Sequence, residues 1–366
     1  MRILVISTEP YSHNGVATVI TNLYKNDIFA KENMLFFLPS GSNRKMVEEL
    51  FFYGDVRLYD LKCRRKNPFK YTGILCKLIK EKKIDIVHIH GNSHTTVFEL
   101  IAAKLAGCKV RIVHAHNTSC RHMTSHKLLS PLFNALCTYR LACGEEAGSF
   151  MYGKKPFTVI KNATDTQKFT FDKELRQKYR SELKIAPDTV LVGHIGVIDE
   201  RKNQLFLVRA FAEYQKTNSD SHLVLIGDGR ERENVKNEIL SLGIKDKVSM
   251  LGVREDVQGL LNALDVFALP SHYEGLPLTA IEAQTNGLPC LISANVTPDV
   301  DKTGNVKFLP ITDTLPWSDS LAEISVMSDG ERESACLAAI EKIRESGYDI
   351  KQEAVKLHAL YSSLIK

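Results

Sequence analysis

Two glutamates eight residues apart, Glu274 and Glu282, are the strongest candidates for chemistry in this chain. The first lies in a loop and the second in the helix predicted to follow, so a helix N-terminus falls between the two carboxylates. Pro277 suits the first turn of that helix, where its missing N–H would have no partner anyway. A helix N-terminus binds phosphate and carboxylates accept from hydroxyls, so the segment suits a ligand that carries both groups. Two carboxylates would equally suit a hydrolase that uses them as acid and base.

A second candidate site follows a short apolar run that ends at Gly196. Arg201 and Lys202 come just after it, where a helix is predicted to begin. Backbone N–H groups at a helix N-terminus and two neighbouring cations would bind a pyrophosphate. An exposed basic turn would show the same residues, so both interpretations stay open.

Two further turns after predicted strands give weaker signals. Gly227 stands where a glycine would let a ligand approach the backbone closely. Arg254 stands in a turn that could present backbone groups to a flat base. Ligands of doubly wound sheets bind beyond the carboxyl ends of the strands, so both turns are candidate contacts.

The first predicted strand leads into a turn that contains Asn14 and Gly15. No G-x-G-x-x-G motif is present there, which argues against a nicotinamide dinucleotide. A single glycine that opens a helix can still let a phosphate or a sugar approach the backbone. A plain strand-to-helix turn would look the same.

Four histidines stand near the ends of two predicted strands, His88 and His90 on one and His114 and His116 on the next. Side chains alternate along a strand, so each pair shares a face. We expect each strand to contribute one packed residue and one cleft residue, with His90 and His116 in the cleft. A histidine there can bond a sugar hydroxyl or a phosphate, or exchange a proton. The four could also form a metal site, but no carboxylate accompanies them at metal-ligand spacing, so no metal is predicted.

Short apolar strands alternate with helical patterns along the whole chain. Strands are predicted at 3–7, 34–38, 85–90, 110–114, 140–143, 158–160, 190–196, 222–226, 247–251, 265–269 and 289–293, and helices near 16–25, 43–52, 70–82, 94–106, 126–137, 145–152, 203–216, 231–242, 256–263, 277–287 and 332–345. This alternation predicts α/β architecture with parallel sheets covered on both faces. Two such series of similar length predict two doubly wound domains.

The length of 366 residues also favours two domains. The boundary is predicted in the polar, turn-rich stretch 162–187, which gives an N-terminal domain of residues 1–170 and a C-terminal domain of residues 171–349. The remaining segment, about 350–366, has one apolar face and predicts a final helix.

The composition is that of a soluble globular protein, with 44% hydrophobic and 25% charged residues. The N-terminus is too short in apolar residues for a signal peptide, and no apolar run is long enough for a transmembrane helix. The 8 cysteines form no C-x-x-C pair, which is typical of reduced thiols. We therefore expect a cytoplasmic protein.

The positive charge is concentrated in the first half of the chain. Residues 1–170 carry 25 lysines and arginines against 13 acidic residues, whereas the remainder carries 23 against 30. The excess lies mainly in segment 62–83, where apolar residues alternate with the basic ones. This segment fits a membrane surface or a solvated helix face. Nucleic acid is disfavoured as a partner, because no helix-turn-helix, zinc-finger or RNP pattern accompanies the charge.

Together these residues resemble the retaining nucleotide-sugar glycosyltransferases of the GT-B fold, glycosyltransferase family 4. The resemblance covers nearly the whole chain, and the E-x7-E spacing of Glu274 and Glu282 is its most specific part. Supporting segments are 85–90, 159–162, 227–229 and 263–271, and the segments 274–278, 281–284 and 287–289 are most similar to enzymes of capsular and exopolysaccharide assembly.

The resemblance implies roles for residues of the second half. Glu282 would hold the ribose hydroxyls of the nucleotide, and Glu274 would contact hydroxyls of the donor sugar. Lys202 would neutralise the leaving diphosphate, and Arg254 would lie beside the base. Donor contacts near Glu274 would come from the loop residues that follow it: Gly275, Leu276, Pro277 and Leu278.

The resemblance also implies the architecture of the first half. Two facing Rossmann-like domains would line one cleft, and the final helix would cross back to the first domain. Gly15 would let that domain close over the phosphates, and His116 would face the donor sugar near the reaction centre. Acceptor-side candidates are Asn14, His90 and Asn117.

One position departs from the family pattern. The family usually has an arginine directly after the glycine of the second-domain strand, but here Gly196 is followed by Val197. One of the two diphosphate cations is thus missing from its usual place, and Arg201 is the candidate to replace it.

The predicted function is a transfer, with retention of configuration, of a sugar from a UDP-sugar to a glycan or polyprenyl-diphosphate-linked acceptor. The leaving phosphate would help to deprotonate the acceptor hydroxyl, and no metal or other cofactor would be required. The basic segment would hold the enzyme at the inner face of the plasma membrane. The alternatives are a nucleotide-sugar epimerase of the same architecture and a nucleotide-sugar-binding subunit with a weakened site.

Overall fold

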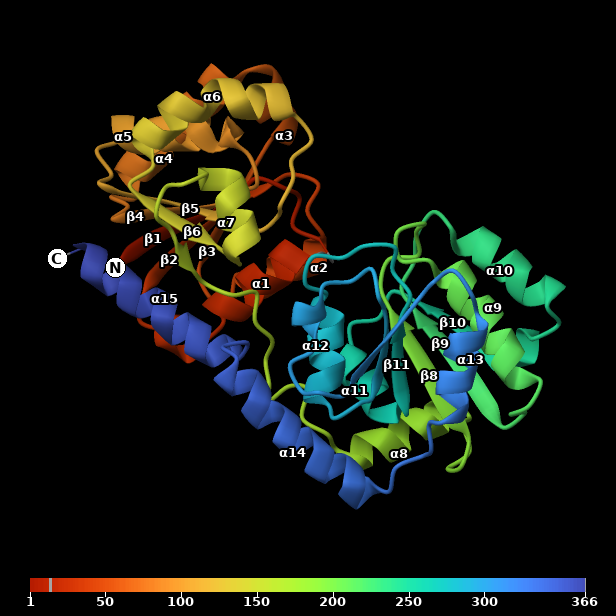
Figure 1. The fold of residues 1–366 in the computed structure, drawn as a ribbon. Coiled ribbons are helices and arrows are strands. Elements are labelled where there is room, and N and C mark those ends of the chain that lie inside the picture. The colour runs from red at the N-terminus through yellow and green to blue at the C-terminus, as the bar shows by residue number, and fades with distance from the viewer. Residues whose placement is uncertain (13–14, 366) are drawn as a thin grey trace. The chain divides into compact units, whose positions relative to one another are not determined.

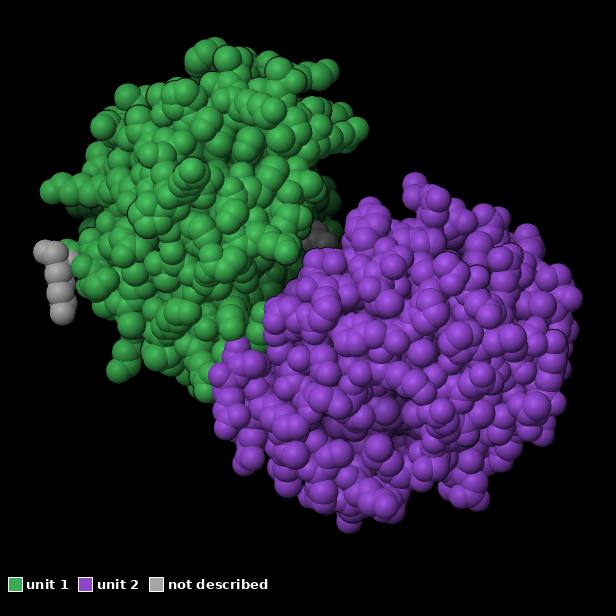
Figure 2. Space-filling view, in the orientation of Figure 1, with its two compact units in different colours: residues 1–163, 347–366 green, residues 164–346 purple. Residues whose placement is uncertain are grey.

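The computed structural model describes residues 1–12 and 15–365. Unit 1 comprises Met1–Ala163 together with Gly347–Lys366, and unit 2 comprises Thr164–Ser346 (Figure 2). The first division thus falls slightly before the boundary expected at residue 170. The chain returns to unit 1 at Gly347, so the final helix belongs to the N-terminal unit.

Unit 1 is built on a seven-stranded parallel sheet with the order β3-β2-β1-β4-β5-β6-β7 (Figure 1). Its strands are β1 (Arg2–Ser7), β2 (Asn33–Pro39), β3 (Asp55–Tyr59), β4 (Ile86–His90), β5 (Val110–Ala115), β6 (Tyr139–Ala142) and β7 (Thr158–Val159). Its helices are α1 (Gly15–Tyr24), α2 (Arg44–Leu50), α3 (Leu61–Lys66), α4 (Pro68–Glu81), α5 (Val97–Leu105), α6 (Met123–Leu136), α7 (Glu145–Tyr152) and α15 (Ile350–Ile365).

Unit 2 repeats this architecture with a six-stranded parallel sheet in the order β10-β9-β8-β11-β12-β13. Its strands are β8 (Val190–Ile195), β9 (Ser221–Ile226), β10 (Val248–Gly252), β11 (Val266–Leu269), β12 (Cys290–Ser293) and β13 (Val306–Leu309). Its helices are α8 (Lys173–Glu182), α9 (Gln204–Gln215), α10 (Arg232–Ser241), α11 (Val257–Ala263), α12 (Leu278–Thr285), α13 (Leu315–Ala322) and α14 (Asp329–Glu345). The prediction of two doubly wound parallel sheets is confirmed.

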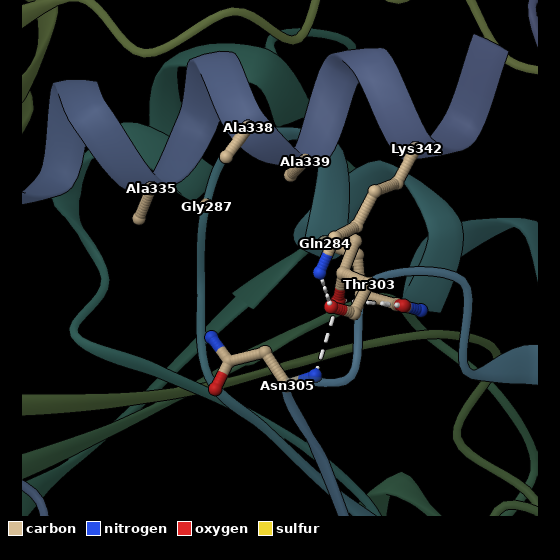
Figure 3. A pocket seen from close by; sticks show the side chains of 8 residues that line it. All are labelled: Gln284, Gly287, Thr303, Asn305, Ala335, Ala338, Ala339 and Lys342. Atoms are coloured by element: carbon tan, nitrogen blue, oxygen red, sulfur yellow. Dashed lines mark hydrogen bonds between the residues drawn. The ribbon is translucent and has the colours of Figure 1, made fainter. Parts of the chain in front are cut away.

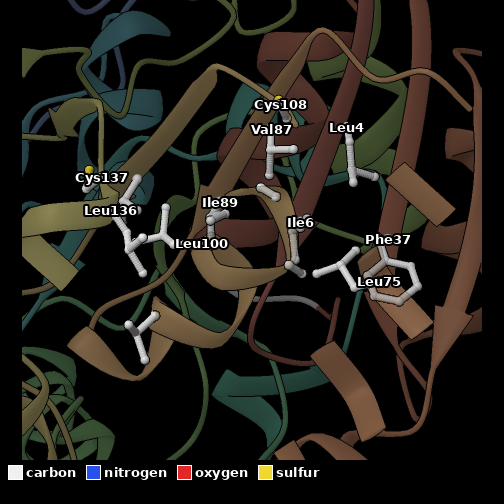
Figure 4. Packing of buried hydrophobic residues seen from close by; sticks show 14 of the residues in the cluster. Leu4, Ile6, Phe37, Leu75, Val87, Ile89, Leu100, Cys108, Leu136 and Cys137 are labelled. Carbon is white, nitrogen blue, oxygen red and sulfur yellow. The ribbon is translucent and has the colours of Figure 1, made fainter. Parts of the chain in front are cut away.

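The two faces of the unit 1 sheet carry different side chains. Val87 and Ile89 of β4 belong to the apolar core, which also takes Leu75 from α4 and Leu100 from α5 (Figure 4). Because side chains alternate along a strand, the histidines of β4 lie on the opposite face. Helices α1 and α15 pack together, and their tyrosines reach that face.

The final helix is fixed to unit 1 by polar contacts along its length. The Glu353 carboxylate accepts a hydrogen bond of 2.7 Å from the backbone N–H of Lys161. The Tyr361 hydroxyl lies 2.7 Å from that of Tyr24 on α1. These buried contacts make α15 part of the N-terminal unit, as the resemblance implies.

The strands that the sequence did not predict, β3 and β13, are edge strands. In β3 the side chains of Val56 and Tyr59 are buried, whereas those of Asp55, Arg57 and Leu58 are exposed. An edge strand with one neighbour does not need the continuous apolar sequence of a central parallel strand. Hydrophobicity alone therefore gave too weak a signal.

One basic residue of segment 62–83, Arg64, is not part of an exposed surface. Arg64 donates to both carboxylate oxygens of Glu99, at 2.6 and 3.2 Å, and the Glu99 side chain is fully buried. This pair fastens α3 to α5. Arg65 and Lys66, by contrast, are exposed.

Candidate functional site

The central feature of unit 2 is an ion pair at the carboxyl edge of its sheet. The Lys202 amine lies 2.7 Å from the Glu274 carboxylate, and both side chains are about nine-tenths buried. Lys202 follows β8 and Glu274 follows β11, and these strands are neighbours in the sheet. Arg201 lies 3.5 Å from the other Glu274 oxygen, and the Ser271 hydroxyl donates to the carboxylate at 3.2 Å. The two segments identified separately in the sequence therefore meet.

Backbone contacts hold the two loops of this ion pair together. The N–H of His272 donates to the Arg201 carbonyl at 2.8 Å, and the Asn203 amide donates to the Pro270 carbonyl at 3.2 Å. The Asp199 carboxylate accepts from the N–H of Lys202 at 2.9 Å. Asn203 has a left-handed backbone conformation, with φ of 57°. The turn after β8 is thus built to direct Lys202 toward the loop after β11.

Gly196 has a steric role under the lysine. A Cβ atom at this position would lie 3.2 Å from Cε of Lys202, so a larger residue would crowd the side chain. Gly227 is required for a different reason, because its φ is +135° and a Cβ atom there would collide with the Gly196 carbonyl. The turns after β8 and β9 therefore pack directly against each other, and this packing alone explains the glycine at 227.

Helix α12 begins at Leu278, one residue later than expected, and Pro277 is its N-cap. Pro277 cannot supply a side-chain oxygen, so the first N–H groups of α12 have no side-chain cap. Gly275 has open space on the side where a Cβ would project. An uncapped N-terminus beside an open loop suits an anionic group.

Glu282 lies in the second turn of α12, with 8% of its surface exposed. Burial raises the pKa of its carboxyl group to about 7, and the nearby Lys168 opposes this shift. Within residues 1–12 and 15–365 its carboxylate accepts no hydrogen bond. A carboxylate without internal partners is available to the hydroxyls of a ligand.

Arg254 uses its guanidinium within the protein. Two of its nitrogens donate to the Asp256 carboxylate, at 2.8 and 2.5 Å, and the Tyr179 hydroxyl donates to the same group at 2.8 Å. These bonds to Arg254 lower the pKa of Asp256 to about 2. Arg254 can therefore offer a ligand its backbone rather than its side chain.

In unit 1 the expectation of one packed and one cleft histidine per strand is wrong. All four side chains, His88, His90, His114 and His116, are buried, because α1 and α15 cover the sheet face on which they lie. His90 in particular is 1% exposed, so it lies behind His116 instead of in an open position.

The His116 ring is held by two neighbours. Its Nε2 lies 2.8 Å from Nδ1 of His90, and its Nδ1 lies 3.1 Å from the Asn162 side-chain oxygen. The Asn92 side chain accepts from the backbone N–H groups of both His116 and Asn117, at 2.8 and 3.1 Å. Burial lowers the pKa of His116 to about 4, so the ring is uncharged near neutral pH. Asn117, directly after it, is exposed.

Residues at the first turn of unit 1 are only partly described. Gly15 begins α1, is exposed, and has open space where a Cβ would project. Asn14 lies outside the described residues.

The sequence analysis missed Asn92 and Asn162, which orient the loop and the ring at His116. Both follow strand ends, and asparagine in such turns commonly bonds neighbouring backbone groups. That signal was available, but their partners are 24 and 46 residues away in the chain.

A hollow of about 180 Å³ in unit 2 contains none of the candidate residues (Figure 3). It lies between α12 and α14, where alanines at 335, 338 and 339 leave space beside Gln284. Thr303 donates to the Gln284 side chain at 3.2 Å, which ties two residues of its wall together. This hollow plays no part in the proposed chemistry.

Comparison with known proteins identifies the class of enzyme. The family described as glycosyl transferases group 1 matches residues 176–301, which include the turn after β8, the Lys202–Glu274 pair and α12. The chain is a glycosyltransferase, and this part of it matches the group 1 model. This glycosyltransferase is 29% identical to a Bacillus subtilis (strain 168) protein named as a glycosyltransferase, EpsF, over 96% of its own length and 94% of that relative.

A second relative is the Escherichia coli UDP-Gal:alpha-D-GlcNAc-diphosphoundecaprenol alpha-1,3-galactosyltransferase. It is 35% identical to this glycosyltransferase over 60% of each chain. Among solved structures, HepE (Alr3699) of Anabaena in complex with UDP aligns with a TM-score of 0.78 and 18% identity, over 99% of this chain and all of that one. The fold of the glycosyltransferase is therefore GT-B, as predicted.

Proposed function

We propose that this glycosyltransferase transfers a sugar from a UDP-sugar to a glycan or polyprenyl-diphosphate-linked acceptor, with retention of configuration, in the assembly of a capsular or exopolysaccharide. The Lys202–Glu274 pair is the observation that carries this proposal. UDP in the HepE complex, and UDP-Gal and a diphosphoundecaprenol-linked acceptor in the name of the E. coli relative, support the choice of substrates.

The donor would bind at the carboxyl edge of the unit 2 sheet. Glu282 would accept from the ribose hydroxyls, and the uncapped N-terminus of α12 would bind the diphosphate. The backbone around Gly227 and Arg254 would lie beside the base. Each of these groups follows the carboxyl end of a parallel strand, where ligands of this fold class bind.

The ion pair gives the donor site a cation, Lys202, that can change its anionic partner. Without donor, Glu274 neutralises the buried Lys202 at 2.7 Å. A bound diphosphate would take over Lys202, which would free the Glu274 carboxylate to accept from hydroxyls of the donor sugar. Neither charge would be left buried without a partner at either stage, which avoids the large desolvation cost of an isolated ion.

Arg201 would replace the cation that is missing at Val197. Its guanidinium lies 3.5 Å from Glu274 and its side chain is 38% exposed, so it can turn toward a ligand. With Lys202, it would stabilise charge on the departing diphosphate, and the leaving phosphate would take the acceptor proton. This chemistry requires no metal ion at the diphosphate.

Unit 1 would bind the acceptor. The acceptor-side candidates are Asn14, His90 and Asn117. Gly15 would lie beside the donor phosphates, and His116 would serve as a fixed, uncharged hydrogen-bonding group that faces the donor sugar. His90 would act by orienting His116, because the structure buries it behind that ring.

The exposed part of the basic segment would hold the enzyme at the inner membrane surface. Phe69 and Ile74 on α4 are 83% and 50% exposed, beside the exposed charges of Arg65, Lys66 and Lys70. Apolar side chains among basic ones suit an anionic lipid surface. Within the described chain, no helix combines the length and the apolarity needed to span a bilayer.

The test is a transfer assay with UDP-, GDP- and ADP-sugars and a polyprenyl-diphosphate-linked GlcNAc acceptor. We expect turnover with a UDP-sugar and a product whose new bond keeps the donor's anomeric configuration by NMR. An epimer released without acceptor would instead indicate an epimerase. Tight UDP-sugar binding without turnover on any acceptor would indicate a binding subunit.

A further inference from the structure

The histidines of β4 and β5 form a cluster inside unit 1, and the proposed transfer chemistry gives a role only to His116 and to His90 behind it. The register of these neighbouring strands pairs His90 with His114. The ring centroid of His88 lies 4.3 Å from that of His90 and 5.4 Å from that of His114. These three side chains are at most 1% exposed.

Hydrogen bonds at one end of this cluster occupy one nitrogen of His90. Nδ1 of His116 lies 3.1 Å from the Asn162 side-chain oxygen, and Nε2 of His116 lies 2.8 Å from Nδ1 of His90. These contacts leave Nε2 as the remaining nitrogen of the His90 ring.

That nitrogen has no hydrogen-bond partner among the described residues, and Nε2 of His88 has none either. In the same part of the chain, the ring nitrogens of His114 have no partner other than the backbone of Ile160. A buried polar atom left without a hydrogen-bond partner destabilises the fold. One ring nitrogen from each of the three histidines lies within 4.8 Å of the others. A cation that accepts several imidazole lone pairs would remove this cost.

We propose that His88, His90 and His114 bind one divalent transition-metal ion of the zinc class inside unit 1. Imidazole nitrogen is a preferred ligand of such ions, and three histidines with a water as fourth ligand form an established coordination set.

The surroundings of the ligands support this assignment. Metal-bound histidines normally use their second ring nitrogen for a hydrogen bond that fixes the ring. Nδ1 of His88 is bonded to the hydroxyls of Tyr24 and Tyr361, and Nδ1 of His90 is bonded to His116. Two of the three proposed ligands thus have one anchored nitrogen and one without a partner.

The ion would join parts of unit 1 that are distant in sequence. Tyr24 belongs to α1 and Tyr361 to α15, and both contact the same ligand histidine. The site would therefore fix the two helices to β4 and β5, on the sheet face opposite the apolar core. It goes beyond the proposed function, because the donor chemistry of unit 2 depends on Lys202 and Arg201.

The experiment measures metal in protein made without a polyhistidine tag. We expect about one zinc, or another first-row transition metal, per chain by inductively coupled plasma mass spectrometry after gel filtration. The variants His90→Gln and His114→Gln should lose it, whereas His222→Gln in unit 2 should keep it. Less than about a tenth of an equivalent in the wild type, or equal metal in all variants, would overturn the proposal.

A second measurement keeps the test decisive if the ligand variants do not fold. Metal-depleted wild-type protein titrated with Co²⁺ should develop the visible absorption bands of a tetrahedral nitrogen site. Tyr361→Phe should weaken this binding by about 10–100-fold, because it removes the hydrogen bond that orients His88. Absence of the bands in folded wild-type protein would refute the site.

Discussion

The carboxyl edges of the two sheets carry polar residues at equivalent places but differ in charge. In unit 2, Lys202 and Glu274 form a buried ion pair at 2.7 Å, with Arg201 beside it. In unit 1, His90 and His116 are buried without an ionic partner, and burial lowers the pKa of both rings. A counter-charge lets a group stay ionised inside a protein, whereas its absence forces the group to be neutral. Unit 2 is thus equipped to stabilise charge and unit 1 to orient uncharged groups.

The largest effect should come from removing the exchangeable cation of unit 2. Lys202→Met should lower kcat by roughly 10²–10³-fold, the loss typical of one charge stabiliser of a transition state. Steady-state kinetics with the preferred UDP-sugar measures it. Lys178→Met, on the exposed surface of α8, is the matched control. If Lys202→Met kept nearly wild-type turnover, the carboxyl edge of the unit 2 sheet would not act by stabilising charge.

Glu282 makes the comparison testable by pH. Its folded-state pKa of about 7 lies above the ordinary value of 4.5, so the carboxylate that we propose accepts from ribose forms only as pH rises. Affinity for UDP-glucose, which does not titrate here, should be roughly 30-fold weaker at pH 5.5 than at pH 8. Calorimetry at both pH values measures it. The Glu282→Gln variant should bind UDP-glucose weakly at both pH values. If the affinity of the wild type does not change with pH, Glu282 does not bind the ribose.

The same shift predicts a change in stability. A folded pKa above the unfolded one gives stability that is present below pH 4.5 and lost as pH rises through about 7. The melting temperature of Glu282→Gln should therefore rise relative to the wild type between pH 5 and pH 8. An unchanged difference between the two proteins would show that Glu282 is ionised throughout.

A smaller effect is expected from the uncharged edge of unit 1. His116→Gln should lower kcat by about tenfold, the value of one hydrogen bond, without changing the affinity for UDP. Asn162→Ala should cause a similar loss, because Asn162 fixes the ring of His116. If His116→Gln weakened UDP binding as strongly as Glu282→Gln, His116 would belong to donor binding.

The smallest effect concerns the basic segment. Replacing Arg65 and Lys66 by serine should weaken binding to anionic liposomes about fivefold for each charge, since a surface charge contributes about 1 kcal/mol. Sedimentation at low salt measures it. Neutralising the exposed Lys178 and Lys236 of unit 2 is the control. If both variants bind anionic liposomes equally well, the basic segment is only a solvated surface of the helices.

The sequence predicted the alternating fold, because central parallel strands are continuously apolar and their ends are punctuated by glycine. It also singled out two residues that meet at the carboxyl edge of the unit 2 sheet, whose role in donor binding stays a prediction. Lys202 and Glu274 were assigned separately, and strand adjacency brings them together. Edge strands such as β3 escaped detection, since they bury few side chains.

The sequence also could not predict which side chains pair with partners far away in the chain. The basic residues of segment 62–83 look alike in sequence, yet Arg64 is paired with Glu99, 35 positions away, and is removed from the surface. In the same way, alternation showed that His88 and His90 share a face, but the helices that bury this face were not predictable from the strands. Partner identity depends on the tertiary packing of distant segments, which local patterns do not contain.

The return of the chain to unit 1 has a consequence for its synthesis. Unit 2 is continuous, so it can fold as soon as residues 164–346 have left the ribosome. Unit 1 has to wait for α15, which is made after the whole of unit 2, although most of its residues are made first. Until α15 has been made, the sheet face that carries His88 lacks the cover that Tyr361 provides. The first 163 residues therefore cannot complete their own fold before the second unit has been synthesised.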